Sequence, residues 1–114
     1  IASQGSFTSG SAEVAQSFTA TLDQVGETIN QESGNVRIEG HTDNIPVAFS
    51  DRFTSNWDLS AARAASVAAY LTNSAQLSDE RVQVLGFADT LPLASNDSSE
   101  GRSRNRRIEI RIAN

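Results

Sequence analysis

The stretch VRIEGHTD, residues 36–43, decides how this chain folds. Val36 and Ile38 alternate with Arg37 and Glu39, which is the two-residue period of a strand with one buried face. The strand then ends in a polar segment whose last residue is Asp43. Residues 44–55 follow it, and their apolar residues show neither helical nor strand periodicity. Loops of that length in compact domains are usually functional or mobile. The stretch therefore predicts a central strand that delivers polar groups to a long loop.

Further elements are predicted on both sides of this strand. Apolar residues at helical spacing and an alanine-rich run each predict a helix, and alternation of apolar residues predicts strands. The predicted elements are strands over 1–7, 36–41, 82–86 and 108–112 and helices over 11–29 and 57–73, with Ser11 capping the first helix and Asn56 or Asp58 the second. Residues 91–104 are rich in Pro, Asn, Ser and Gly and are predicted as a loop.

The order β-α-β-α-β-β predicts an α+β two-layer sandwich. Two main helices cover one face of a small mixed sheet, because each strand has only one apolar face to bury. The opposite face carries charged residues, for which we expect a solvated ladder with His41 as a surface histidine beside it. The residues of this ladder are Arg37, Glu39, Arg107, Glu109 and Arg111.

Composition limits the function. The 114 residues fit one domain, residues 1–114, and nine arginines against 14 acidic residues give a net charge of −5. The chain has no cysteine and one histidine, which excludes thiol chemistry and most metal sites built from several histidines. A Ser–His41–Asp triad is formally available, but no nucleophile elbow accompanies it, and no carboxylate pair stands out for glycoside cleavage. We expect no enzymatic activity, no catalytic residue, no cofactor and no metal.

Arg63 is the most informative single position. It lies at helical spacing from Leu59, Val67 and Tyr70, within the apolar stripe of the second predicted helix. An inward-facing guanidinium is costly unless an anion pairs with it. A carboxylate of the protein or of a ligand could fill that role, and Asp43 at the strand end could pair with Arg63, accept a hydrogen bond from a ligand amine, or do both.

Residues 101–107, GRSRNRR, contain four arginines. Such a segment could bind a polyanion, or its arginines could pair with carboxylates of the same chain. No aromatic residues interleave with the arginines and the domain as a whole is acidic, so we expect no nucleic-acid binding.

Several short motifs, taken together and in order, resemble the OmpA-like peptidoglycan-binding domain. They are Gly40-His41-Thr42-Asp43, Asn56, Leu59-Ser60-x-x-Arg63-Ala64, Gly86-x-Ala88-Asp89 with Pro92, and Gly101-Arg102-x-x-Asn105-Arg106-Arg107-Ile108-Glu109. Within that family the spacing from Asp43 to Asn56, followed by Trp57, is similar to the B subunit of the bacterial flagellar stator, the MotB and PomB type.

The resemblance implies non-covalent binding of the diaminopimelate in the peptidoglycan stem peptide, which anchors a stator to the cell wall. Diaminopimelate offers an ammonium for Asp43 and a carboxylate for Arg63. The implied binding residues are Thr42, Asp43, Asn56, Leu59, Arg63 and Arg106, the last bracing Asp43 or adding positive charge to the rim.

The resemblance also implies a setting. The chain opens on Ile1 without an initiator methionine, and we expect it to be the periplasmic part of a protein held in the inner membrane by an N-terminal transmembrane helix and carrying a plug segment. The implied partners are peptidoglycan, a second B subunit in a homodimer, a MotA- or PomA-type A subunit, and periplasmic motor ring proteins. The alternative is a wall-tethering domain of the OmpA or Pal type, from an outer-membrane protein or lipoprotein without a motor role.

Overall fold

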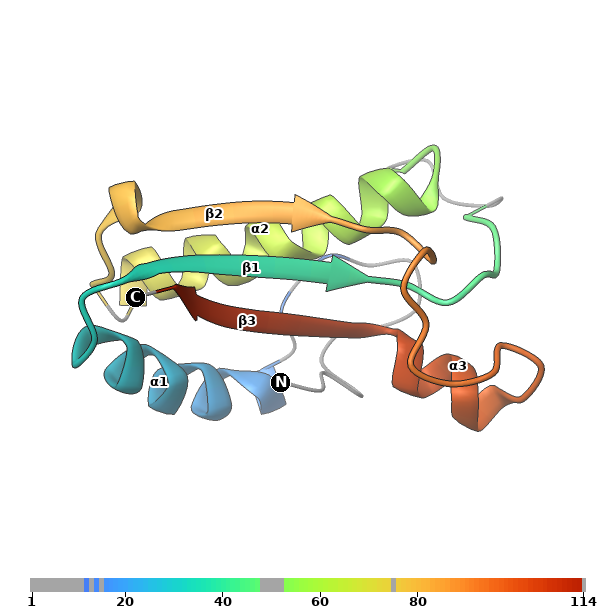
Figure 1. The fold of residues 1–114 in the computed structure, drawn as a ribbon, viewed down its shortest axis with the longest axis horizontal. Helices are drawn as coiled ribbons and strands as arrows, with labels where there is room; N and C mark the ends of the chain where they lie inside the picture. The colour runs from blue at the N-terminus through green and yellow to red at the C-terminus, as the bar shows by residue number, and fades with distance from the viewer. Residues whose placement is uncertain (1–11, 13, 15, 48–52, 75, 114) are drawn as a thin grey trace.

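A computed structural model describes residues 12, 14, 16–47, 53–74 and 76–113 (Figure 1). In chain order the elements are α1 (Gln16–Asn30), β1 (Asn35–His41), α2 (Asn56–Ser74), the 3-10 turn η1 (Asp79–Arg81), β2 (Val82–Gly86), α3 (Ser99–Asn105) and β3 (Arg107–Ala113). The predicted α+β class is confirmed. The predicted first strand, 1–7, and the predicted cap Ser11 lie outside the described residues.

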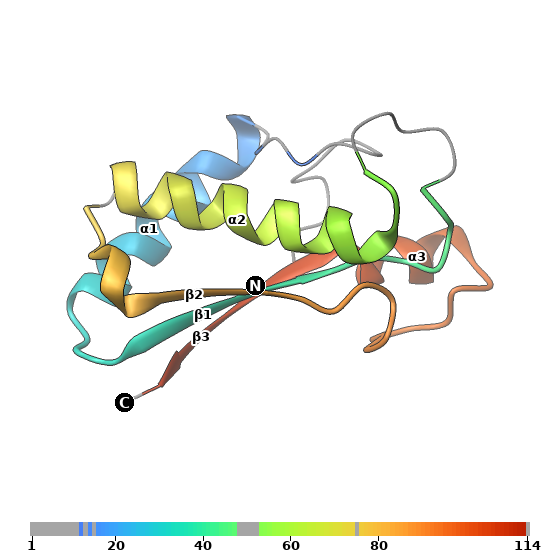
Figure 2. The ribbon, with the colours of Figure 1, turned by 90° about the horizontal axis from the view of Figure 1, so that it is seen from above.

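The sheet is mixed, with the strand order β2-β1-β3. Central β1 runs parallel to β2 and antiparallel to β3. Helices α1 and α2 lie on the same face of this sheet, as predicted (Figure 2). The core between the layers contains Phe18, Leu22, Ile29, Val36, Ile38, Ala64, Val67, Leu71, Leu77 and Ile108. None of the helices in the described part of the chain is long and apolar enough to cross a membrane.

Helix α1 ends against an arginine from a distant part of the chain. Arg81 donates through Nε to the carbonyl of Gly34, and through Nη2 to the carbonyls of Ile29, Glu32 and Gly34, at 2.7 to 3.3 Å. One of these carbonyls, that of Ile29, is in the last turn of α1, and the other two belong to the turn that follows the helix, so the guanidinium satisfies acceptors that have no partner within the helix. Arg81 thereby ties the end of α1 to the start of β2.

The cap of α2 differs from the prediction. The Ser55 hydroxyl accepts from the backbone N–H of Asp58, and the Asp58 carboxylate accepts from the N–H and hydroxyl of Thr54. This reciprocal arrangement satisfies donors at the helix start in the manner of a capping box. The predicted cap Asn56 is the first residue of the helix, and its side chain is therefore available for contacts outside the helix.

Helix α2 packs directly on the backbone of the sheet at two paired glycines. Gly40 of β1 and Gly86 of β2 are register partners, and both lie beneath the first half of α2. A Cβ at residue 40 would overlap the Ser60 carbonyl, and one at residue 86 would lie 2.7 Å from the Ala61 nitrogen. The absence of side chains at these two positions sets the height of α2 above the sheet.

The segment predicted as a loop over 91–104 contains α3. Its N-cap is Ser98, whose hydroxyl accepts from the N–H of Gly101, and Gly101 lies so close to the Ser95 carbonyl that a Cβ would overlap it. The prediction was wrong because α3 has seven residues and no apolar stripe that periodicity could reveal. Figure 1 shows α3 at the same end of the molecule as the end of β1 and the start of α2.

Substituting Gly40 by Ala tests the close packing of α2. The added methyl group meets the Ser60 carbonyl, which is backbone and cannot rotate away, so we expect the free energy of unfolding to fall by about 3 kcal/mol or more. Urea denaturation measures the change. The matched control is Gln83→Ala, on the exposed part of β2, for which we expect a change within about 0.5 kcal/mol. Equal stabilities for the two variants would contradict this description of the packing.

Candidate functional site

Asp43 lies just beyond β1, where the sequence predicted a functional carboxylate. Its Oδ2 is 2.7 Å from Nη1 of Arg106, and its Oδ1 accepts from the backbone N–H of Ile45 at 3.0 Å. Only 7% of the residue is exposed. Each carboxylate oxygen has two lone pairs, so both oxygens retain capacity to accept from a further donor.

The backbone around Asp43 is fixed by two of the predicted binding residues. Asn56 donates through Nδ2 to the carbonyls of Asp43 and Ile45, at 3.4 and 3.1 Å, which connects the start of α2 to the end of β1. The buried Thr42 donates its hydroxyl to the Asp43 carbonyl at 2.8 Å and its N–H to the carbonyl of Ala88. Both residues therefore act on the position of Asp43, through its backbone.

Arg63 faces inward, as its spacing predicted, and is only 3% exposed. Leu59, also a predicted binding residue, is buried one turn before it. Burial and the neighbouring Arg106 cation lower the pKa of Arg63 to about 10, whereas the Asp43 carboxylate acts in the opposite direction. Arg63 stays protonated at neutral pH. Two guanidinium groups from α2 and the end of α3 thus converge on one carboxylate from the end of β1.

Ser60 and Ala88 complete the support of the site, and the sequence analysis did not identify either role. Ser60 is fully buried, and its hydroxyl donates to the Trp57 carbonyl and accepts from the N–H of Ala88. Ala88 has a positive φ of 53°, which is unusual for a residue other than glycine. A small side chain fits here because Ala88 is enclosed by Thr42 and Ser60.

Asn105 positions Arg106, a role that the sequence also did not reveal. Its side chain is fully buried: Oδ1 accepts from the N–H groups of Leu93 and Ala94, and Nδ2 donates to the carbonyl of Ala94 and to Asn96. A buried amide with all these partners holds the preceding loop against α3. The signal for such a role, an asparagine directly before two arginines, is too short to interpret without the fold.

The four arginines of residues 101–107 differ in their contacts. Arg102 donates to the Asn96 carbonyl, Arg106 pairs with Asp43, and Arg107 pairs with Glu109, whereas Arg104 is exposed. Three of the four guanidiniums thus bind groups of the same chain. This arrangement corresponds to the intrachain pairing that the sequence analysis left open, not to a continuous basic patch.

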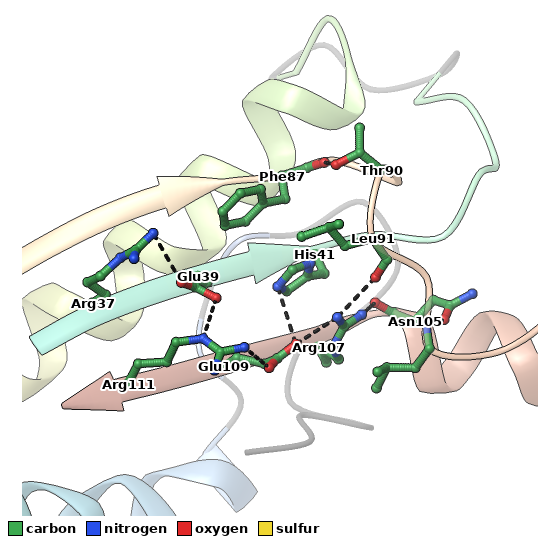
Figure 3. A network of polar contacts seen from close by, with 11 residues as sticks. Arg37, Glu39, His41, Phe87, Thr90, Leu91, Asn105, Arg107, Glu109 and Arg111 are labelled. Atoms are coloured by element: carbon green, nitrogen blue, oxygen red, sulfur yellow. Dashed lines mark hydrogen bonds and ion pairs between the residues drawn. The ribbon is translucent and has the colours of Figure 1, made fainter. Parts of the chain in front are cut away.

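The polar face of the sheet is only in part the solvated ladder that alternation predicted. Glu39 and Arg107 are 4% and 5% exposed, and a chain of ion pairs runs along β1 and β3 and joins them at Arg111 and Glu39 (Figure 3). Glu39 contacts Arg37 and Arg111, and Glu109 contacts Arg111 and Arg107 at 2.6 to 3.4 Å. The interpretation as solvated surface holds for Arg111 and Arg37, whose side chains are largely exposed. It was wrong for Glu39 and Arg107, which their ion-paired neighbours cover.

His41 is likewise buried, with 1% exposed, and is not a surface histidine. Its ring stacks on Phe87 with centroids 5.3 Å apart and an angle of 9° between planes (Figure 3). Nε2 lies 3.5 Å from the Glu109 carboxylate, and neither ring nitrogen has a hydrogen-bond partner among the described residues. The side chain points to the sheet face opposite the helices (Figure 3). His41 therefore packs against Phe87 on that face and does not line the candidate site.

The arrangement at the end of β1 suits a ligand that carries both charges. Asp43 can accept from an ammonium, and the guanidiniums of Arg63 and Arg106 can bind a carboxylate. Within the described segments no group of three or more His, Cys, Asp or Glu side chains is placed to hold a metal ion. Thr42, Asn56, Arg63 and Arg106 each act on Asp43 or its backbone, and Leu59 lies one turn before Arg63 in α2.

A profile of the OmpA family matches residues 6–106, nearly the whole chain. The chain belongs to the OmpA family. Among curated relatives, motility protein B of Bacillus subtilis is 42% identical over 78 residues, covering 68% of this chain and 30% of the relative. This OmpA-family chain spans less than half the length of the first curated relatives it matches.

Two solved structures resemble this OmpA-family domain over almost its full length. The cell wall anchor of the T6SS from Pseudomonas aeruginosa is 39% identical with a TM-score of 0.89, covering 98% of this chain and 77% of the other. The periplasmic domain of Helicobacter pylori MotB, residues 78–256, is 26% identical with a TM-score of 0.87, covering 96% and 71%. The family resemblance seen in the sequence is confirmed, including its similarity to the MotB type.

The buried His41 predicts a loss of stability in acid. Burial, with a smaller contribution from Arg107, holds the pKa of His41 below its ordinary value of 6.5, although Glu109 and Glu39 oppose the shift. Below that value the unfolded chain binds a proton that the folded chain resists, so the free energy of unfolding falls as the pH falls, by at most about 1.4 kcal/mol per pH unit. Above it, this contribution to stability is fully present.

Urea denaturation between about pH 5 and pH 8 measures this effect. In His41→Phe, which keeps a ring against Phe87 but cannot titrate, we expect a flatter profile between about pH 5 and 6.5 than in the parent. The difference between the two profiles isolates the histidine from carboxylates that titrate lower. Parallel profiles would show that His41 is not the titrating group.

Proposed function

We propose that this OmpA-family domain binds peptidoglycan non-covalently, through the diaminopimelate of the stem peptide, and makes or breaks no bond. The observation that carries the proposal is the convergence of buried Arg63 and partly exposed Arg106 on Asp43 at the end of β1. The side chain of Arg106 is 41% exposed and that of Asp43 is 10% exposed, so the group has an open side. A zwitterionic ligand matches this distribution of charge.

In the proposed complex, the ligand ammonium donates to Asp43 while the ligand carboxylate lies against the guanidinium of Arg63. The second contact is charge-assisted and directional because a guanidinium presents paired N–H donors to a carboxylate. Asn56 and Thr42 contribute by holding the Asp43 backbone, and Leu59 closes the buried side. The site is preorganised on a strand end and a helix, so little conformational entropy is lost on binding.

The proposed biological role is to anchor a flagellar stator to the cell wall from the periplasm. Support comes from the match to motility protein B and from the likeness to a cell wall anchor and to a periplasmic MotB domain. In this role the partners are peptidoglycan, a second copy of the protein, a MotA- or PomA-type subunit and periplasmic motor ring proteins, with an N-terminal transmembrane helix in the inner membrane. The motility relatives favour this role over an OmpA- or Pal-type tether without a motor.

Co-sedimentation with purified peptidoglycan sacculi tests the binding function. We expect Asp43→Asn and Arg63→Gln each to weaken binding about tenfold or more, because each removes a charged partner of the ligand. Arg104→Gln is the control, since it removes one positive charge from exposed α3 without touching Asp43. Thermal unfolding of each variant verifies that it is folded. Equal sedimentation of the parent, Asp43→Asn and Arg63→Gln would exclude the assigned site.

A further inference from the structure

We propose that binding at the end of β1 weakens in acid: a proton taken up by His41 draws Glu109 away from Arg107, and the segment that carries Arg106 then loses its support. This dependence on pH rests on the proposed function and adds a form of regulation to it. His41, Glu109 and Arg107 lie on the sheet face opposite the helices, and none of them is a proposed ligand contact (Figure 3).

Arg107 ties three parts of the chain together next to Arg106. It is 5% exposed, and its guanidinium donates to Glu109 of β3, to the carbonyl of Leu91 at 3.0 Å and to the carbonyl of Asn105 at 3.3 Å (Figure 3). Leu91 lies in the loop after β2, and Asn105 is the last residue of α3. Arg106 stands between Asn105 and Arg107 in the chain, so the position of Arg106 depends on this tie.

The Glu109 carboxylate holds the guanidinium of Arg107 through a single oxygen. Oε2 accepts from Nε of Arg107 at 2.7 Å and contacts its Nη2 at 2.6 Å, while Oε1 accepts from Arg111 at 2.9 Å. A carboxylate oxygen has two lone pairs, so Oε2 has no capacity left for another donor. A further donor that binds Oε2 therefore displaces an N–H group of Arg107.

His41 is positioned to supply that donor. It is 1% exposed, neither ring nitrogen has a hydrogen-bond partner among the described residues, and Nε2 lies 3.5 Å from Oε2 of Glu109. The stacked ring of Phe87 fixes the plane of the imidazole. A protonated imidazole has two donors, and a buried donor without an acceptor is costly. The Glu109 oxygen beside Nε2 is the acceptor that a protonated His41 would bind.

The charges around His41 set the pH range of the effect. Arg107 and Arg111 of β3 oppose a proton on the ring, whereas Glu109 of β3 and Glu39 of β1 favour it. Burial is the largest influence, and together with Arg107 it keeps the pKa of His41 below its ordinary value of 6.5. His41 is therefore neutral at neutral pH and takes up its proton in acid.

The direction of the effect follows from linkage. The state in which Arg107 is held by Glu109 has a neutral His41 and keeps Arg106 beside Asp43, and we assign ligand binding to this state. Binding therefore lowers the pKa of His41 further, and a proton on His41 weakens binding by the corresponding factor. Through this group the affinity is constant above the pKa of the free protein, and below it falls by at most about tenfold per pH unit.

NMR titration of the imidazole measures this linkage directly, because His41 is the only histidine of the chain. The measurement uses protein without a histidine tag, and the probe is a synthetic tripeptide of alanine, glutamate and diaminopimelate. We expect saturation with the tripeptide to move the midpoint of the His41 titration to lower pH by about 0.5 unit or more, because the bound state disfavours the proton.

Isothermal titration calorimetry with the same tripeptide tests the consequence for affinity. In the parent we expect affinity to fall by about threefold or more between about pH 7.5 and pH 5. His41→Phe keeps a ring against Phe87 but cannot take up a proton, so we expect the parent's affinity at neutral pH and a smaller loss in acid. The difference between the two profiles removes the contribution of every other titrating group.

Arg107→Lys tests the route through Arg107. A single ammonium cannot reproduce the contacts of the guanidinium with Glu109 and with two carbonyls, so we expect weaker binding at neutral pH and a smaller further loss in acid. Arg104→Lys is the matched control, because it makes the same chemical change at an exposed position of α3 and should behave as the parent. Thermal unfolding at each pH verifies that every variant is folded.

The outcomes are distinguishable. An equal His41 midpoint in free and saturated protein, or an equal pH dependence of affinity in the parent and His41→Phe, overturns the acid effect while leaving peptidoglycan binding intact. Parent-like affinity and pH dependence in Arg107→Lys overturn the route through Arg107. Failure of the tripeptide to bind at neutral pH, together with absence of sedimentation with sacculi, contradicts the proposed function itself and the acid effect with it.

Discussion

The contact of helix α2 with the backbone of the sheet at Gly40 and Gly86 determines the geometry of the candidate site at the end of β1. Because neither strand carries a side chain there, α2 lies close to the sheet. At this distance the Ser60 hydroxyl can accept a hydrogen bond from the N–H of Ala88. The hydrogen bond from Ala88 to Ser60 holds the loop after β2 against α2. In the same loop, the Ala88 carbonyl accepts a hydrogen bond from the N–H of Thr42. Asp43 follows directly, so the carboxylate and the Arg63 guanidinium are placed by one packing constraint shared by the helix and two strands.

Electrostatics then gives this end of the molecule its chemical character. The net charge of the chain is −5, yet two guanidiniums meet one carboxylate where β1, α2 and α3 converge. Arg63 and Asp43 are 3% and 7% exposed, so water screens their charges poorly and their local arrangement matters more than the net charge of the chain. The overall charge is thus a poor guide to the ligand. The local arrangement favours a small zwitterion over a polyanion.

The two faces of the sheet differ in chemistry, but both contain buried residues. The face under α1 and α2 is apolar and forms the core. The other face has charged residues, but Glu39, His41 and Arg107 are almost as inaccessible as core residues. Ion pairs along and between β1 and β3, with the stacked ring of Phe87, make this burial tolerable (Figure 3). The candidate site residues that follow His41 are therefore packed against buried side chains on both faces of the sheet.

The sequence by itself determined the α+β class, the main helices, the three described strands and the inward position of Arg63, because periodicity states which residues share a face. It also indicated Asp43, since a polar group at a strand end before a long loop is a local pattern. Only the tertiary structure decided that α3 exists, that Ser55 caps α2, that the charged sheet face is covered, and that Asn105 holds the loop before Arg106. The caps of α2 and α3 are local, but neighbouring Ser, Asn and Asp residues compete for each capping position and sequence alone does not choose between them. The covered sheet face depends on contacts between residues distant in the chain, and alternation in one strand cannot reveal what lies over it.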